Sequence, residues 1–165
     1  MENRVKQKKF VSLVLYLHNT QNEVVPFFQK VLPVFQDNFT NFEIVCVNDA
    51  CTDGTIGVLK EYLEENHCSE MVNIIHMSFF HGLESAMNAG RDLAIGDFIY
   101  EFDTAYVDYP SELIMEVYDK LLEGNDIVSA GTRDHVRMTS GFFYFCYNKT
   151  SRGRGKIGPE TFRIV

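Results

Sequence analysis

Gly96-Asp97-Phe98-Ile99-Tyr100-Glu101-Phe102-Asp103-Thr104-Ala105 is the stretch that decides the fold of this chain. Its apolar run, Phe98 to Phe102, is interrupted by a single acid and predicts a short buried strand. The strand is expected to end at Asp103, and Tyr109-Pro110 to begin a new helix. Because ligands of open α/β sheets collect at the carboxyl ends of the strands, Asp103 is expected to face a cleft and to hold a cation or a polar substrate.

Hydrophobic periodicity predicts alternating strands and helices on both sides of this stretch. Further strands are expected at 11–17, 42–47, 72–77 and 126–130. Between the strands, apolar residues recur at i, i+3, i+4 and i+7, which is typical of amphipathic helices. These helices are expected to begin near Val24, Asp53, Gly82 and Pro110, and Pro33 is expected to kink or end the first of them. The order predicts one α/β domain over residues 1–165, with a mostly parallel sheet and helices on both faces.

The composition is that of a globular domain, with 45% hydrophobic and 23% charged residues. No apolar run approaches the ~20 residues that span a bilayer, and residues 1–10 lack the apolar core of a signal peptide. A cytoplasmic protein, peripheral on the inner face of a membrane or free of it, is therefore expected. The cysteines show no zinc-type spacing and are expected to be reduced thiols.

The charge distribution limits the partners of the chain. A formal net charge of −8 argues against general nucleic-acid binding. Basic residues gather near the end of the chain, at Lys149, Arg152, Arg154, Lys156 and Arg163. They predict either a solvated basic tail or contact with phosphate groups or an anionic lipid surface.

Two common nucleotide-binding signatures are missing. The first strand leads to His18-Asn19-Thr20, and not to Gly-x-Gly-x-x-Gly. A phosphate loop with Gly-Lys-Ser or Gly-Lys-Thr is also absent.

Three segments together resemble family 2 glycosyltransferases of the GT-A fold. Val47–Thr55 resembles their Val-Asp-Asp-Gly-Ser-x-Asp-Gly-Thr loop, and Phe80–Gly90 their Asn-x-Gly-x-x-x-Ala-x-x-x-Gly helix. Ala94–Pro110 is similar to the segment that contains their Asp-x-Asp motif. The branch that acts on polyprenyl phosphates, such as dolichyl-phosphate mannosyltransferases, is resembled at 131–133, 143–149 and 161–164. The resemblance extends from Val11 to Val165.

The resemblance implies a Rossmann-like three-layer sandwich that binds a nucleotide-diphosphate sugar. The residues implied for the donor pocket are Tyr16, His18, Asn19, Asp49 and Gly82. Asp103 would be the catalytic acid that holds Mg²⁺ or Mn²⁺ on the diphosphate, which suits a hard cation. Arg133 and Arg163 would bind phosphate, or would instead pair with acids of the protein. The implied reaction transfers a hexose, with inversion, to a polyprenyl phosphate or a glycan.

The departures from the family pattern leave alternatives open. Asp-x-Asp reads Asp103-Thr104-Ala105, so the second acid is lost and a weakened metal site is expected. Glu101 and Asp108 are conceivable substitutes for the lost acid. Glu101 also fits an acid at a strand end that forms an ion pair with a basic side chain, and Asp108 also fits a turn residue. A catalytically degenerate binding or assembly module is the alternative function. A nucleotidyltransferase lacks support, because its glycine- and lysine-rich signature is absent. Since the family continues beyond this point, we expect the acceptor- and membrane-facing side to be truncated.

Overall fold

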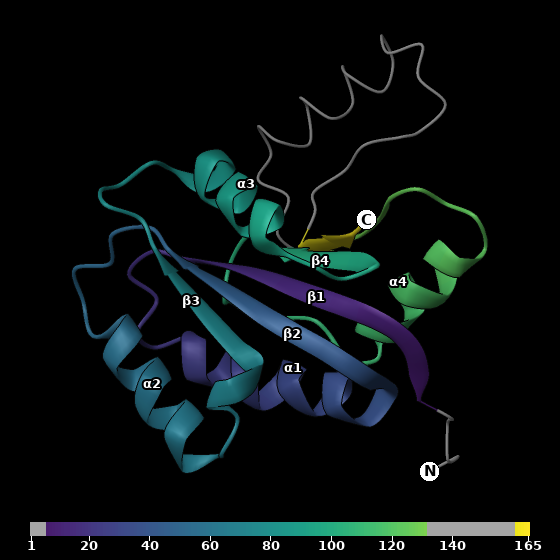
Figure 1. Cartoon of the computed structure of the whole chain (residues 1–165), viewed down its shortest axis with the longest axis horizontal. Helices are drawn as coiled ribbons and strands as arrows, with labels where there is room; N and C mark the ends of the chain where they lie inside the picture. The colour runs from purple at the N-terminus through teal and green to yellow at the C-terminus, as the bar shows by residue number, and fades with distance from the viewer. Residues whose placement is uncertain (1–5, 132–160) are drawn as a thin grey trace, which may run out of the picture.

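A computed structural model of the chain describes residues 6–131 and 161–165. A sheet forms the middle layer, with α3 on one face and α1, α2 and α4 on the other (Figure 1). The strands are β1 (Gln7–Leu17), β2 (Phe39–Asn48), β3 (Val72–His76), β4 (Phe98–Phe102), β5 (Val128–Ala130) and β6 (Phe162–Ile164). The helices are α1 (Val24–Asn38), α2 (Thr55–Glu65), the 3-10 turn η1 (Ser69–Met71), α3 (Leu83–Leu93) and α4 (Leu113–Leu122).

The strand order of the sheet confirms the α/β prediction. It runs β3-β2-β1-β4-β6-β5, and β3, β2, β1 and β4 are parallel. The chain first moves outward from β1 to β3, and then returns through α3 to place β4 on the other side of β1. The strand order therefore reverses between β1 and β4, which is where open α/β sheets bind their ligands.

The far edge of the sheet differs from the prediction. β6 runs antiparallel to both β4 and β5, and it separates these two strands. The sequence predicts no strand in this segment, because Phe162–Ile164 is only three residues long and shows no clear alternation of apolar and polar residues. Its strand character comes from pairing with distant residues, which a local pattern does not contain.

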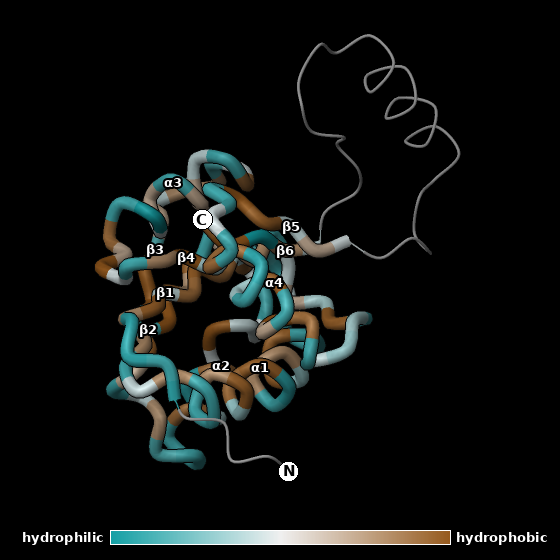
Figure 2. Tube along the Cα trace, turned by 90° about the vertical axis from the view of Figure 1, so that its right-hand side faces the viewer, coloured by the Kyte–Doolittle hydropathy of each residue, from teal (hydrophilic) through white to brown (hydrophobic). Residues whose placement is uncertain are grey.

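An aromatic core fills the face that α1, α2 and α4 cover. Figure 2 shows the hydrophobic strands enclosed between α3 on one side and α1 and α2 on the other. Phe35 contacts Tyr100 with ring centroids 5.2 Å apart, and Phe102 contacts Phe162 at 4.7 Å. All four side chains are buried, so this face carries the larger share of the apolar burial that stabilises the fold.

The core under α3 is much smaller. Its buried members are Val14, Val45, Val47, Ala86 and Met87. Gly90 lets α3 approach the sheet closely, because a Cβ there would lie 2.4 Å from Val14 Cγ1 and 2.8 Å from Val47 Cγ2.

Of the two outcomes expected at Pro33, an end of the helix was wrong. α1 does not end at Pro33 but continues to Asn38. Pro33 lies on the exposed side of α1, while Val31, Leu32 and Phe35 are buried around it. Their packing outweighs the one backbone hydrogen bond that proline removes. Leu93, whose spacing from Met87 and Gly90 predicts a position on the inner face of α3, is instead 58% exposed. Among the described residues, no helix is long and apolar enough to cross a membrane.

Candidate functional site

Polar residues gather where the strand order reverses. Leu15 pairs with Phe102 and Leu17 with Asn48, so Tyr16, Asp49 and Asp103 all lie at the carboxyl ends of adjacent strands. Tyr16 packs with Val14 and Val47 on the face that α3 covers, and Asp49 bonds Tyr16 and the loop that starts α3. The structure therefore brings the two predicted acids to one edge of the sheet, with β1 between their strands.

Asp49 is fully buried at this edge, and the protein itself occupies its carboxylate. Oδ1 accepts the backbone N–H of His81 at 2.8 Å, and Oδ2 accepts that of Gly82 at 2.9 Å. The hydroxyl of Tyr16 donates to Oδ2 at 3.1 Å. Through these three bonds Asp49, which lies at the end of β2, joins β1 to the loop that starts α3. Its exposed fraction is 0%.

The same contact changes the acidity of Tyr16. Burial raises the pKa of Tyr16 to about 12, and the hydrogen bond and negative charge of Asp49 act in the same direction. Tyr16 therefore stays protonated and acts as a hydrogen-bond donor at neutral pH.

His18 and Phe80 form an aromatic wall beside Asp49. The two ring centroids are 4.6 Å apart and tilted by 50°. His18 Nδ1 lies 2.7 Å from the carbonyl oxygen of Asp49, and a carbonyl can only accept, so Nδ1 carries the proton. His18 Nε2 is then left with a lone pair near Asn19 Nδ2, at 3.5 Å. Phe80 is 58% exposed and presents its ring to solvent at this edge.

Asn19 ties the end of β1 to the loop that follows β2. Its backbone φ is 53°, in the left-handed region that asparagine tolerates, and its Oδ1 accepts the N–H of Thr52 at 2.8 Å. Asp53 Oδ1 accepts the N–H of Thr55, the first residue of α2, at 3.0 Å. Asp53 therefore helps to start the helix, as its position in the sequence suggested.

Asp103 is half-buried at the end of β4, whereas Ala105 is fully buried against the aromatic core. The position of the missing acid is thus enclosed by apolar neighbours here. Within residues 6–131 and 161–165, no three His, Cys, Asp or Glu side chains are grouped to hold a metal ion. Asp108 is exposed in the following loop.

Glu101 forms ion pairs with basic side chains, as one of the two alternatives for this residue predicted. It is fully buried, and its Oε1 accepts from Arg91 Nη1 at 3.1 Å. Its Oε2 accepts from Arg163 Nε at 2.5 Å. The guanidinium of Arg163, predicted to bind phosphate, thus bonds Glu101 and lies level with it on β6. Arg91 was not predicted from the sequence, although it directly follows Gly90, the last residue of the motif at Phe80–Gly90. Arg133, the other predicted phosphate ligand, lies outside the described residues.

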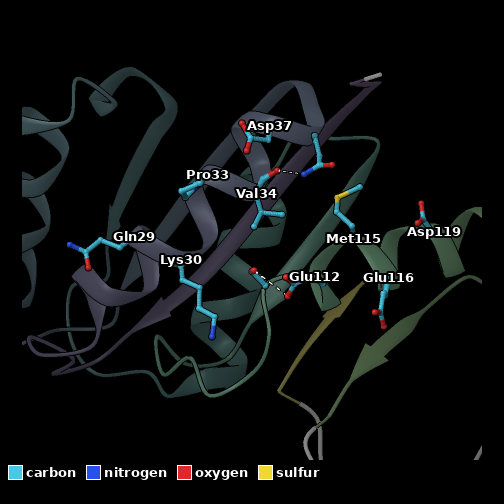
Figure 3. Close-up of a pocket in the computed structure, with 11 residues that line it drawn as sticks. Gln29, Lys30, Pro33, Val34, Asp37, Glu112, Met115, Glu116 and Asp119 are labelled. Atoms are coloured by element: carbon cyan, nitrogen blue, oxygen red, sulfur yellow. Dashed lines mark hydrogen bonds between the residues drawn. The ribbon is translucent and has the colours of Figure 1, made fainter. Parts of the chain in front are cut away.

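The described part of the chain has several hollows, of which two are compared with this edge. One, of about 300 Å³, opens beside the loop after β4 and is lined by Asn22, Glu23, Pro26, Ala105, Tyr106 and Val107. A larger groove of about 660 Å³ lies between α1 and α4, with side chains from both helices pointing into it (Figure 3). None of the predicted site residues lines either hollow.

Comparison with known proteins identifies the family to which this fold and the polar edge of the sheet belong. The profile of Glycosyl transferase family 2 matches residues 12–163. The chain belongs to this family, and its three-layer architecture is the GT-A fold, as the sequence motifs predicted.

Relatives and solved structures agree with this membership. The chain is 34% identical to an uncharacterized glycosyltransferase of Synechocystis sp. over 94% of its own length and 49% of the relative's. It is 29% identical to a prophage bactoprenol glucosyl transferase homolog of Escherichia coli, over 94% and 51% of the two chains. A mannosyltransferase from Pyrobaculum calidifontis, solved with GDP-Man and Mn²⁺, superposes with a TM-score of 0.69 at 16% identity, covering 96% and 44%. The chain thus spans about half the length of the curated relatives it matches.

Proposed function

We propose that this chain is the donor-binding part of a glycosyltransferase that transfers a hexose from a nucleotide-diphosphate sugar. The observation that carries the proposal is the cluster of Tyr16, His18, Asp49 and Asp103 at the edge where the strand order reverses. The exposed Phe80 ring offers a stacking surface for a nucleobase, and His18 Nε2 offers an acceptor for a base N–H group.

The donor phosphates would lie between the start of α3 and Asp103. α3 begins directly after Gly82, whose own N–H is bonded by Asp49; for the N–H groups that follow, the described part of the chain shows no side-chain cap. A helix N-terminus of this kind favours an anion. The leaving nucleoside diphosphate gains negative charge as the sugar departs, so positive partners at this point lower the barrier.

Asp103 would hold Mg²⁺ or Mn²⁺ together with the diphosphate. One carboxylate suits a cation that takes most of its oxygen ligands from phosphate and water, which is a usual arrangement for Mg²⁺. The metal, when bound, neutralises charge on the leaving group. The buried Ala105 leaves the protein without a second acid in this motif, so metal affinity should depend strongly on the nucleotide.

A polyprenyl phosphate is the acceptor that we propose. The bactoprenol glucosyl transferase homolog among the relatives supports this choice. A lipid phosphate is already ionised and can attack the sugar carbon without a general base, whereas a glycan hydroxyl must lose a proton. Such an acceptor would place the protein at a membrane surface, and an inverting displacement would follow from direct attack.

Calorimetric titration tests the donor site. UDP, GDP and UDP-glucose are titrated into the protein with Mn²⁺, and again with EDTA. We expect one nucleotide to bind in a Mn²⁺-dependent manner and Asp103→Asn to weaken it by at least about tenfold. Asp37→Asn, at an exposed acid near the end of α1, is the matched control and should bind as the wild type does. Absence of binding by all three nucleotides would contradict the proposal.

The burial of Ala105 favours one second candidate, a catalytically degenerate module that binds nucleotide sugar without transferring it. The two candidates differ in turnover and not in binding. Release of UDP or GDP from the sugar nucleotide, measured with polyprenyl phosphate present, separates them: sustained release supports the transferase, and binding without release supports the module.

A further inference from the structure

We propose that Glu101 is a positioning residue: its ion pair with Arg163 sets the register of β6 against β4, and this register fixes the end of β4 that Asp103 follows. The inference deepens the proposed function and rests on it for the role of Asp103. All of the contacts that support it lie within the chain itself.

The connection that leads to β6 is too long to fix its register. Ala130 of β5 pairs with Phe162 of β6, and residues 131–161 lie between these two positions in the sequence. In a β-hairpin a short loop permits one pairing, whereas a connection of this length is compatible with several. The register of β6 must therefore be set by contacts of its own three residues, Phe162–Ile164.

Apolar packing alone selects this register only weakly. Phe162 and Ile164 are buried, and they lie opposite Phe102 and Tyr100 of β4. Because side chains alternate along a strand, a shift of β6 by two residues would keep its apolar side chains on the aromatic face. Ile164 would then lie opposite Phe102, and one large apolar pair would replace another.

The charged residue of β6 distinguishes the two registers. Arg163 lies opposite Glu101, which is fully buried, and Arg163 Nε donates to Glu101 Oε2 at 2.5 Å. The same shift by two residues would place Arg163 opposite Asp103, the acid proposed to hold the metal. Glu101 would lose one of the two arginines that neutralise it, and a buried charge without sufficient partners is strongly disfavoured.

Arg91 holds the same acid from the other side. Its Nη1 donates to Glu101 Oε1 at 3.1 Å, so the acid joins β4 to α3 as well as to β6. Buried ion pairs contribute little net stability compared with apolar side chains of similar volume, but they can specify one arrangement among several. We therefore infer that the group of Glu101, Arg91 and Arg163 determines the register more than it determines the stability.

Cross-strand contacts measured by NMR report the register directly. The N–H of Ile99 donates to the carbonyl of Val165 at 2.8 Å, and the N–H of Val165 donates to the carbonyl of Ile99 at 3.0 Å. The next pair along the ladder, Tyr100 and Ile164, therefore exchanges no backbone hydrogen bond, and its Hα atoms lie close together. A strong nuclear Overhauser effect between these two Hα atoms is the signature of the observed register.

The test variant replaces the whole charged group by apolar side chains, so that no charge is left buried. It combines Arg91→Met, Glu101→Leu and Arg163→Leu. We expect its urea midpoint to stay within about 0.5 M of the wild type. The Hα contact between Tyr100 and Ile164 should nevertheless weaken at least about twofold, and a contact between Phe102 and Ile164 should appear.

Two controls separate the register from the loss of charge in general. Arg163→Lys keeps a positive charge opposite Glu101 and should keep the wild-type contact. Lys120→Met combined with Glu123→Leu removes an exposed ion pair of α4 and should also keep it. If the combined variant does not fold, Arg163→Leu alone is measured in the same way, because Arg91 still neutralises Glu101 there. The wild-type contact at full intensity, with no second contact, would overturn the proposal.

Titration of Mn²⁺ tests whether the register acts on Asp103. Calorimetry with UDP or GDP at a series of Mn²⁺ concentrations gives the concentration at which nucleotide binding is half-maximal. In the combined variant this concentration should rise at least about tenfold, as expected when the groups around a metal ligand are displaced. The nucleotide affinity at saturating Mn²⁺ should change less than about twofold, because the base pocket near Tyr16 lies apart from β6.

The outcomes of this titration separate the inference from the proposed function. An unchanged Mn²⁺ requirement would overturn the positioning role, and so would an equal loss of affinity at every Mn²⁺ concentration. In both cases nucleotide binding by the wild type would still support the proposed function. If neither UDP nor GDP binds the wild type, the proposed function fails, while the Hα contacts of Ile164 still decide whether Glu101 sets the register of β6.

Discussion

The two faces of the sheet are held by different forces. On the face of α1, α2 and α4, a large aromatic core surrounds residues such as Phe35 and Phe102. On the α3 face, the apolar cluster is small and buried or half-buried acids connect the helix to the strands. Asp49 holds the start of α3, Glu101 holds Arg91 in its last turns, and Glu43 accepts the N–H of Ile95 just after it at 2.8 Å.

This difference separates stability from function within one domain. Apolar burial is non-directional and tolerates small shifts, whereas hydrogen bonds to carboxylates fix the position of the partner. The predicted donor residues Tyr16 and Asp49 lie on the α3 face, and Asp103 lies at the same edge. We therefore expect substitutions in the aromatic core to act mainly on the free energy of unfolding, and substitutions under α3 to act also on nucleotide binding.

The largest effect is expected in the aromatic core. Phe35→Ala should lower the free energy of unfolding by about 3–5 kcal/mol, since the side chain is fully buried among Phe39, Phe42 and Tyr100. Urea unfolding followed by circular dichroism measures it. Phe79→Ala, at a side chain that is 63% exposed, is the control and should change stability by less than about 0.5 kcal/mol. Similar losses in both variants would remove the distinction between the faces.

A smaller effect is expected from the acid that links α3 to β6. Glu101→Gln removes the charge that Arg91 and Arg163 share and should cost about 2 kcal/mol. This lies below the ~3–5 kcal/mol of a fully enclosed pair, because both arginines keep about a third of their side-chain surface in water. Glu123→Gln, in the exposed pair with Lys120, should cost less than about 0.5 kcal/mol in the same urea assay. Equal losses of unfolding free energy in the two variants would show that the buried group of Glu101, Arg91 and Arg163 stabilises the protein no more than an exposed ion pair does.

The close approach of α3 predicts a third effect. Gly90→Ala drives a methyl group against Val14 and Val47 and should cost about 1–3 kcal/mol, despite the better helix propensity of alanine. Gly57→Ala in α2, where a Cβ meets nothing within 4 Å, should instead stabilise the protein by about 0.5–1 kcal/mol. Thermal unfolding of the two variants gives opposite shifts in Tm, and shifts of the same sign would contradict the packing described.

The smallest effect concerns Tyr16 at alkaline pH. Its pKa is raised to about 12, so between pH 10 and 12 the folded state retains a proton that the unfolded state has lost. The stability that the protonated Tyr16 contributes is fully present below pH 10 and is lost as the pH rises from 10 through the folded-state pKa of about 12. Tyr16→Phe should be about 1 kcal/mol less stable at pH 8, and the difference should shrink towards pH 12. Urea unfolding at pH 8, 10 and 11 measures it, with the exposed Tyr106→Phe as control; a constant difference would contradict the assignment.

Much of the fold was predictable because most of its helices and strands have a clear local hydrophobic periodicity. The spacing of Val24, Phe27, Phe28 and Val31 predicted α1, and the apolar run to Phe102 predicted β4, since one face of each packs against the core. β6 was not predictable, because three residues hold no periodicity and their pairing partners on β5 and β4 lie about thirty and about sixty positions away. The continuation of α1 through Pro33 depends on packing that local propensity does not contain.

The candidate site was predictable in its location but not in its contacts. Motifs after β2 and β4 correctly predicted that Asp49 and Asp103 share one edge, because parallel strands end together. Whether a carboxylate there faces a ligand or its own backbone depends on the loop from β3 to α3. The sequence carries Gly82 as the one local sign of that conformation. In the same way, an ion pair at Glu101 could be predicted from the sequence. Its partners, Arg91 and Arg163, could be identified only from the tertiary structure.

The most direct test of the account is to map where a nucleotide binds. Backbone amide signals are followed by NMR while UDP or GDP is titrated with Mg²⁺, which is diamagnetic and preserves the signals. The account predicts that the largest shifts fall on residues 16–19, 79–83 and 103, at the carboxyl edge on the α3 face. Shifts concentrated on Lys30, Glu112 and Glu116, in the groove between α1 and α4, would contradict it.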